Sequence, residues 1–187
     1  RALHVLLSNI QLVSLTGSEI FTFTLADYLR RCGHQVSVYA KFLGEYAGRF
    51  RDIGVSVTDD IKRLQGLAFD IAHVHHNITA YEIRNAFPEL PMVFLSHGVL
   101  PFLEQPPVLD LNIHRYLAVS EEVGENLMAK GIDSARIDLV PNLVDPDRFY
   151  EIRPVRQTPR SACVLSYKMA PEVKSLVVQA CHRSGIA

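Results

Sequence analysis

The chain has 187 residues, enough for one domain of ordinary size with its own hydrophobic core and a remainder. Its 19 lysines and arginines nearly balance 20 aspartates and glutamates, and the formal net charge is −1. Because the basic residues are also scattered, the composition argues against a nucleic-acid partner.

Hydrophobic residues make up 48% of the chain but occur in short runs, none near the roughly 18 residues of a membrane-spanning helix. The start, Arg1 to His4, lacks the layout of a signal peptide. Cys32, Cys163 and Cys181 form no Cys-x-x-Cys pair, which favours a reducing cytoplasm over disulfides or a zinc site. We expect a cytoplasmic protein, and the sequence is compatible with peripheral contact at the inner face of a membrane.

Strand and helix patterns alternate from Leu3 to about Phe149, which is typical of a parallel sheet with helices on both faces. We predict a Rossmann-like, doubly wound α/β fold with a parallel sheet of about seven strands. The predicted strands, in chain order, are Leu3–Ser8, Gln35–Tyr39, Val55–Val57, Ile71–Val74, Met92–Ser96, Tyr116–Val119 and Ile137–Val140.

The first predicted helix begins with a capping box, Thr16 to Glu19, and ends at Gly33. Free amides and the helix dipole at Thr16, Gly17 and Ser18 favour an anion, so this loop is a candidate phosphate or sugar site. A glycine that only turns the chain would give the same pattern, and both interpretations stay open.

Three histidines lie at the end of the fourth predicted strand. His73 and His75 point to one face and His76 to the other. Two imidazoles on one face suggest a metal ion, but no carboxylate or thiol lies nearby at ligand spacing. We therefore expect no metal and favour hydrogen bonds from these histidines to a ligand or a loop.

The fifth predicted strand stops abruptly at His97 and Gly98. The carboxyl ends of parallel strands are where open α/β folds bind their ligands, so His97 is predicted to lie at a binding site. It suits a hydrogen-bond donor to a sugar or phosphate, or a general base, although neighbouring backbone groups can also satisfy such a histidine. We expect Gly17 and His97 to meet at one cavity.

Two further segments follow the last strands. Ser120 is predicted to cap a helix that starts with two glutamates and ends at Gly131. Residues 140–149 combine Asn142 with aspartates and prolines, a pattern that predicts a rigid turn.

The patterns predict a first domain over residues 1–152, a linker over residues 153–160 and a second domain from residue 161. The second domain begins with a predicted strand, Ser161–Ser166, and a helix, Pro171–Arg183. Because about thirty residues cannot build a core alone, we expect a truncated domain over 161–187. The alternative is that this strand and helix cover an edge of the first domain.

Three nucleotide-binding and catalytic motifs are absent from the sequence, and their absence argues against three classes of enzyme. The sequence has no Gly-x-Gly-x-x-Gly, no P-loop and no Gly-x-Ser-x-Gly, which argues against a dinucleotide-dependent dehydrogenase, a P-loop NTPase and a serine hydrolase.

Several motifs occur together in a recognisable order: Gly17–Glu19, Arg31–Val36, Phe69–His75, Ser96–Gly98, Val119–Glu121 and Val140–Asp145 with Phe149. Over about Leu3 to Phe149 the chain resembles family 4 glycosyltransferases. The resemblance implies the amino-terminal half of a GT-B enzyme, with the sugar acceptor bound mainly by the first domain and the nucleotide-sugar by the second. It also implies glycosyl transfer with retention of the anomeric configuration.

The resemblance also implies residue roles. His97 would contact the transferred sugar as the catalytic residue, and Lys168 and Lys174 would hold the donor diphosphate. The predicted acceptor- or donor-binding residues are Thr16, Gly17, Ser18, His75, Gly98, Ser120 and Asn142. The family carries two glycines in the first loop, where this chain has Thr16 and Gly17.

The resulting hypothesis is a retaining glycosyltransferase whose substrate is a nucleotide-diphosphate sugar, without a further cofactor. A saccharide, a lipid-linked molecule or a small molecule would accept the sugar. We expect the complete protein, with its missing carboxyl-terminal domain, to be active and this fragment alone to be inactive. The alternative is a non-catalytic carbohydrate-binding or regulatory module with the same fold.

Overall fold

The computed structural model describes residues 1–109, 111–144, 157–164 and 169–186. The chain divides into two compact units, Arg1–Asp145 and Pro146–Ala187. Among the described residues, the first unit contains every strand and four of the α-helices.

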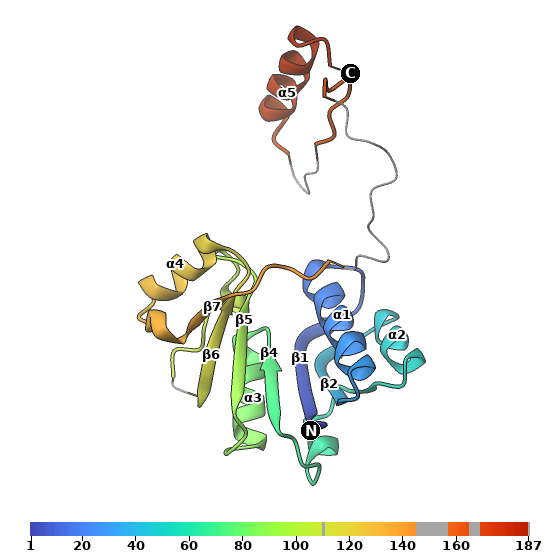
Figure 1. The fold of residues 1–187 in the computed structure, drawn as a ribbon, viewed down its shortest axis with the longest axis vertical. Coiled ribbons are helices and arrows are strands. Elements are labelled where there is room, and N and C mark those ends of the chain that lie inside the picture. Colours follow the sequence, from blue (N-terminus) through green and yellow to red (C-terminus); the bar gives the residue numbers. More distant parts are fainter. Residues whose placement is uncertain (110, 145–156, 165–168, 187) are drawn as a thin grey trace. The chain divides into compact units, whose positions relative to one another are not determined.

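A seven-stranded, all-parallel sheet forms the centre of the first unit, with the strand order β3-β2-β1-β4-β5-β6-β7 (Figure 1). The strands are β1 (His4–Leu12), β2 (Gln35–Leu43), β3 (Ser56–Thr58), β4 (Ile71–Val74), β5 (Met92–Ser96), β6 (Ile113–Ala118) and β7 (Ile137–Leu139). The predicted fold class is confirmed.

Helices cover both faces of this sheet. They are α1 (Gly17–Arg31), α2 (Tyr46–Asp52), α3 (Asn77–Ala86) and α4 (Glu121–Ala129). Side chains of α1 and α2 share one buried cluster with Val38 of β2, whereas α3 and α4 share the other cluster with Tyr39. Because neighbouring residues of a strand point to opposite faces, α1 and α2 lie on one face and α3 and α4 on the other.

The local signals for helix ends are confirmed. Thr16 and Ser120 are the N-caps of α1 and α4. Gly33 and Gly131 follow these helices with φ of 85° and 87°, a left-handed conformation that glycine adopts without strain.

Other elements differ from the prediction. Strand β1 continues to Leu12, four residues beyond its predicted end, because its backbone stays paired with β2 as far as Leu43. The buried Asn9 side chain is tolerated there because it donates to Thr22 Oγ1 at 3.0 Å. A polar residue in a strand interior hid this extension. Helices α2 and α3 were not predicted, and His76, the N-cap of α3, makes no side-chain capping bond.

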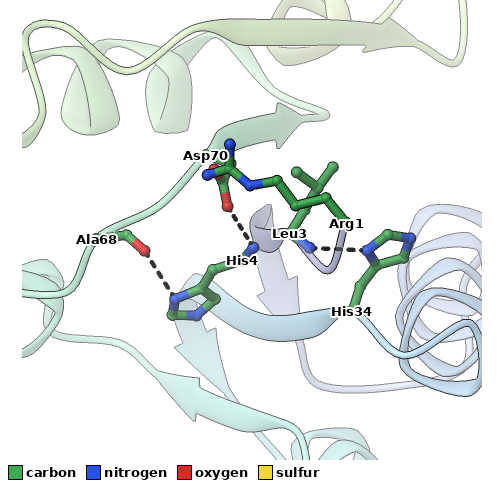
Figure 2. Close-up of polar contacts among 6 residues, drawn as sticks. All are labelled: Arg1, Leu3, His4, His34, Ala68 and Asp70. Carbon is green, nitrogen blue, oxygen red and sulfur yellow. Dashed lines mark hydrogen bonds and ion pairs between the residues drawn. The ribbon is translucent and has the colours of Figure 1, made fainter.

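Polar contacts join the amino end of β1 to the starts of β2 and β4 (Figure 2). The Asp70 carboxylate accepts the backbone N–H of His4 at 2.8 Å and pairs with Arg1. His34 Nδ1 accepts the backbone N–H of Leu3 at 3.1 Å. These bonds lie at the end of the sheet opposite to the predicted site.

In the second unit, the predicted helix is confirmed as α5 (Pro171–Arg183), with Pro171 in its first turn. The predicted strand at Ser161–Ser166 is wrong over residues 161–164, which form no strand, and residues 165–166 lie outside the described part. A strand requires a hydrogen-bonded neighbour, and none is described in this unit. Residues 153–156 of the predicted linker also lie outside the described part, and the domain boundaries stay a prediction.

None of the helices within the described ranges combines the length and the apolar character needed to cross a membrane.

Gly44 provides a test of the packing beside the first loop. A Cβ added to Gly44 would lie 2.8 Å from Val13 Cα and 3.2 Å from Val13 O, so Gly44→Ala must displace the backbone. We expect a loss of about 1–3 kcal/mol in the free energy of unfolding, measured in urea.

Gly48→Ala in α2 is the matched control, because its added Cβ meets nothing within 4 Å. This helical glycine is expected to gain about 0.5–1 kcal/mol when replaced by alanine. Equal stability of the two variants would contradict the close approach at Gly44.

Candidate functional site

The topology opens a space at the carboxyl ends of β1 and β4. These strands are neighbours, but the chain leaves β1 toward β2 and leaves β4 toward β5, in opposite directions along the sheet. The two connections therefore run over opposite faces and leave the strand ends uncovered, which is where doubly wound folds bind ligands.

A cavity of about 490 Å³ lies at this place. Its lining residues are Thr16, Gly17, Ser18, Ile20, Phe21, His97, Glu104, Asn142 and Leu143. The structure thus brings the start of α1 and the end of β5 to one cavity, although Gly17 and His97 are 80 positions apart in the sequence.

Glu19 holds the loop that forms one wall of this cavity. Its fully buried carboxylate accepts the backbone N–H groups of Val13, Ser14 and Thr16 at 2.8, 3.0 and 3.1 Å, and also the Thr16 hydroxyl. The capping box is present, and its carboxylate binds two amides beyond the usual one. Glu19 therefore positions Thr16 and Gly17.

His97 is held in place by a buried histidine, His75. His75 is fully buried, and its Nδ1 lies 2.8 Å from Nε2 of His97. The Phe21 ring packs against both imidazoles, with centroid distances of 5.5 and 5.3 Å, and also against His73 at 6.3 Å. The three imidazoles and Phe21 form one packed group, which we call the histidine cluster.

Burial keeps these imidazoles neutral. Desolvation lowers the pKa of His73 and His97, and of the neighbouring His76, to about 4, and it lowers the pKa of the fully buried His75 well below its usual 6.5. At neutral pH the histidine cluster is therefore uncharged, and it interacts with its surroundings through hydrogen bonds and packing.

Glu104 is a cavity residue that the sequence analysis missed. It lies in a 3₁₀ turn, Phe102–Glu104, and burial raises the pKa of its carboxyl. A Cβ at Gly98 would lie 2.8 Å from Glu104 Oε2, so the glycine leaves room for this carboxylate. The loop between Gly98 and Glu104 shows no helix or strand pattern in the sequence. The nearness of Glu104 to the His97-Gly98 motif along the chain was therefore the only signal that could have pointed to this residue.

The other predicted site residues lie in different places. His75 and Gly98 are absent from the lining: His75 lies within hydrogen-bonding distance of His97, and Gly98 leaves room for the Glu104 carboxylate. Ser120 caps α4, with its Oγ accepting the Val123 N–H at 3.3 Å, and it lines a separate cavity of about 370 Å³. The capping bond and the outer position of β6 hold Ser120 away from the cavity that Gly17 and His97 line, and its binding role stays a prediction.

Of the two predicted donor-phosphate lysines, Lys174 is exposed on α5 in the second unit, and Lys168 lies outside the described residues. Their role stays a prediction.

A larger cavity of about 610 Å³ lies between α3, the loop of residues 102–109 and the segment after α4. It contains none of the predicted site residues. Over the part of the chain that the structure describes, no group of three or more His, Cys, Asp or Glu side chains could hold a metal ion.

The sequence matches the model of Glycosyltransferase Family 4 over residues 15–148. The chain belongs to this family. The matched range includes the Gly17 loop, the histidine cluster, His97 and Asn142. No curated protein sequence matches the chain significantly.

Solved structures show the same fold at low sequence identity. The family 4 chain aligns with HepE from Anabaena in complex with UDP-glucose (TM-score 0.64, 12% identity, 97% of this chain and 50% of HepE). It also aligns with a glycosyltransferase from Rickettsia africae (0.65, 16%, 100% and 50%) and with the lipopolysaccharide outer core galactosyltransferase WaaB (0.61, 12%, 95% and 57%). The chain spans about half the length of these proteins.

Glu19→Gln tests how the first loop is held. The amide would place an NH₂ group against backbone N–H donors, so at least one bond to a buried charged acceptor is lost. We expect a loss of about 3 kcal/mol in the free energy of unfolding, measured by chemical denaturation.

Glu125→Gln, on the exposed side of α4, is the control and is expected to change stability by less than about 0.5 kcal/mol. A Glu19→Gln variant as stable as this control would show that the carboxylate does not organise the loop.

The buried imidazoles predict a pH dependence of stability. Their folded-state pKa values lie below the usual 6.5, so the unfolded chain takes up protons that the folded chain does not. The free energy of unfolding should be constant above pH 6.5 and fall below it, by about 1.4 kcal/mol per pH unit for each such imidazole.

Denaturant unfolding at pH 7, 6 and 5 measures this slope. His76→Gln removes one of the four groups and should lower the slope by about a quarter. Stability that does not change between pH 6.5 and 5 would contradict neutral, buried imidazoles.

Proposed function

We propose that the complete protein is a retaining glycosyltransferase that moves a sugar from a nucleotide-diphosphate sugar to an acceptor. This chain would supply mainly the half that binds the sugar acceptor, and alone it would not transfer sugar at a useful rate. The proposal places the enzyme in the cytoplasm, with peripheral contact to a membrane where the acceptor is lipid-linked.

One observation carries this proposal: the start of α1 and His97 line the same cavity. Free N–H groups and the dipole at a helix start favour a phosphate, and glycine at position 17 lets it approach the backbone. A neutral imidazole beside that position suits a sugar hydroxyl. The cavity thus combines groups for both parts of a nucleotide-sugar.

The solved relatives support the class of donor. HepE was solved with UDP-glucose, and WaaB is described as a galactosyltransferase. In the transfer reaction, the leaving diphosphate gains negative charge that helix-start amides and lysines stabilise in a site that excludes water. We assign the amides of Gly17 and Ser18 and the side chains of Lys168 and Lys174 to this task.

His97→Ala tests the proposal. Removal of a donor aimed at the reacting sugar should lower kcat/KM for sugar transfer by about 10²-fold, while affinity for the sugar acceptor is largely kept. The measurements are initial rates with labelled nucleotide-sugars and calorimetric binding of candidate acceptors to the complete protein.

His114→Ala is the control, because His114 is exposed on β6 and is expected to leave both quantities unchanged. Wild-type protein that binds saccharides but transfers no sugar from any nucleotide-sugar would instead identify a carbohydrate-binding module.

A further inference from the structure

Among the described residues that line the 490 Å³ cavity at the start of α1, only His97 and Glu104 carry ionisable side chains. We infer that His75 locks His97 as a neutral hydrogen-bond donor, and that Glu104 accepts the hydrogen bond of the hydroxyl group to which the sugar is transferred. This inference rests on the proposed function and assigns two residue roles within it.

The direction of the His75–His97 bond follows from burial. The bond joins His75 Nδ1 to His97 Nε2 at 2.8 Å, and only one of these nitrogens can carry the proton. His75 Nε2 is buried and has no hydrogen-bond partner. If His97 donated, the His75 proton would sit on this unpaired nitrogen, and orphaned buried N–H groups are rare because they are costly. His75 is therefore the donor.

This direction determines what His97 offers to a ligand. Its Nε2 lone pair accepts from His75, so the remaining proton lies on Nδ1. No described residue forms a hydrogen bond with Nδ1. His97 then presents an N–H group and no free lone pair, which suits a donor to a substrate oxygen and does not suit a general base. His75 acts through His97 as a positioning residue.

Glu104 supplies the missing hydrogen-bond acceptor. Within the described chain, no donor and no cation pairs with its carboxylate, which faces the cavity over Gly98. Its backbone is held, because Ser96 Oγ donates to Glu104 O at 3.1 Å and the Glu104 N–H donates to Pro101 O at 3.1 Å. A half-buried carboxylate on a fixed turn is well placed to receive an O–H group.

Charge separates the two parts of the cavity. The start of α1 attracts phosphate, whereas the Glu104 carboxylate repels it. The uncharged, hydroxyl-bearing substrate therefore belongs on the Glu104 side. The expected ligand class there is a polyhydroxylated sugar acceptor without a phosphate next to the reacting hydroxyl.

Two-bond ¹H–¹⁵N correlation spectra of the 187-residue chain test the tautomer directly, because they separate protonated ring nitrogens from nitrogens with a free lone pair. We expect wild-type His75 and His97 to be protonated on Nδ1. His75→Phe keeps an aromatic ring but removes the donor, and His97 should then populate both tautomers. In His75→Asn the Nδ2 group replaces the Nδ1 donor, so His97 should keep its tautomer.

The same variants have a kinetic readout in the complete protein. His75→Phe should lower kcat/KM for sugar transfer by about tenfold, and His75→Asn by no more than about threefold. Circular dichroism establishes that each variant is folded. A wild-type His97 protonated on Nε2 would overturn the assignment regardless of the behaviour of the variants.

Glu104→Ala should raise the KM for the sugar acceptor by about 30-fold, the loss expected for a hydrogen bond to a charged group. Glu104→Gln keeps a carbonyl oxygen in place and should raise it by only about fivefold. The KM for the nucleotide-sugar should stay constant in both variants, and Glu125→Ala on the surface of α4 is the control.

An unchanged acceptor KM in Glu104→Ala would overturn the role of Glu104 while transfer itself persists. A wild-type protein without any transfer would refute the proposed function instead, and the tautomers of His75 and His97 would still be measured.

Discussion

The right-handed crossover of parallel strands is the constraint on which this structure depends. It places α1 on one face of the sheet and α3 on the other, because the chain moves in opposite directions from β1 and from β4. The carboxyl ends of these neighbouring strands are thus left uncovered. The loop after β1 and the histidines after β4 and β5 meet there for this reason.

Desolvation then decides the chemistry of the groups that meet. Phe21 of α1 covers three imidazoles, and burial keeps them uncharged at neutral pH. Glu19 is fully buried but is surrounded by three backbone N–H groups and one hydroxyl, which replace its water. The loop at Thr16 and Gly17 is therefore held by hydrogen bonds to the buried Glu19 carboxylate. His97, on the other side of the cavity, is held by packing against Phe21 and by its contact with His75.

Local signals predicted most of the fold. The alternation of strands and helices, the caps at Thr16 and Ser120 and the terminators Gly33 and Gly131 depend on residues close together in the chain, and each is confirmed. The extension of β1 was missed because Asn9 is satisfied by Thr22 of α1, a contact that no strand pattern contains. The strand expected at Ser161–Ser166 failed over residues 161–164, because an apolar run forms a strand only beside a partner.

The sequence by itself determined the alternation of strands and helices, the caps of α1 and α4 and the motifs that mark Glycosyltransferase Family 4. Only the tertiary structure decided that His75 lies behind His97, that Glu104 enters the cavity and that Ser120 does not line it. These facts depend on distances between side chains from different crossovers. Periodicity and capping constrain neighbours along the chain, whereas sheet order and loop packing set which distant groups touch.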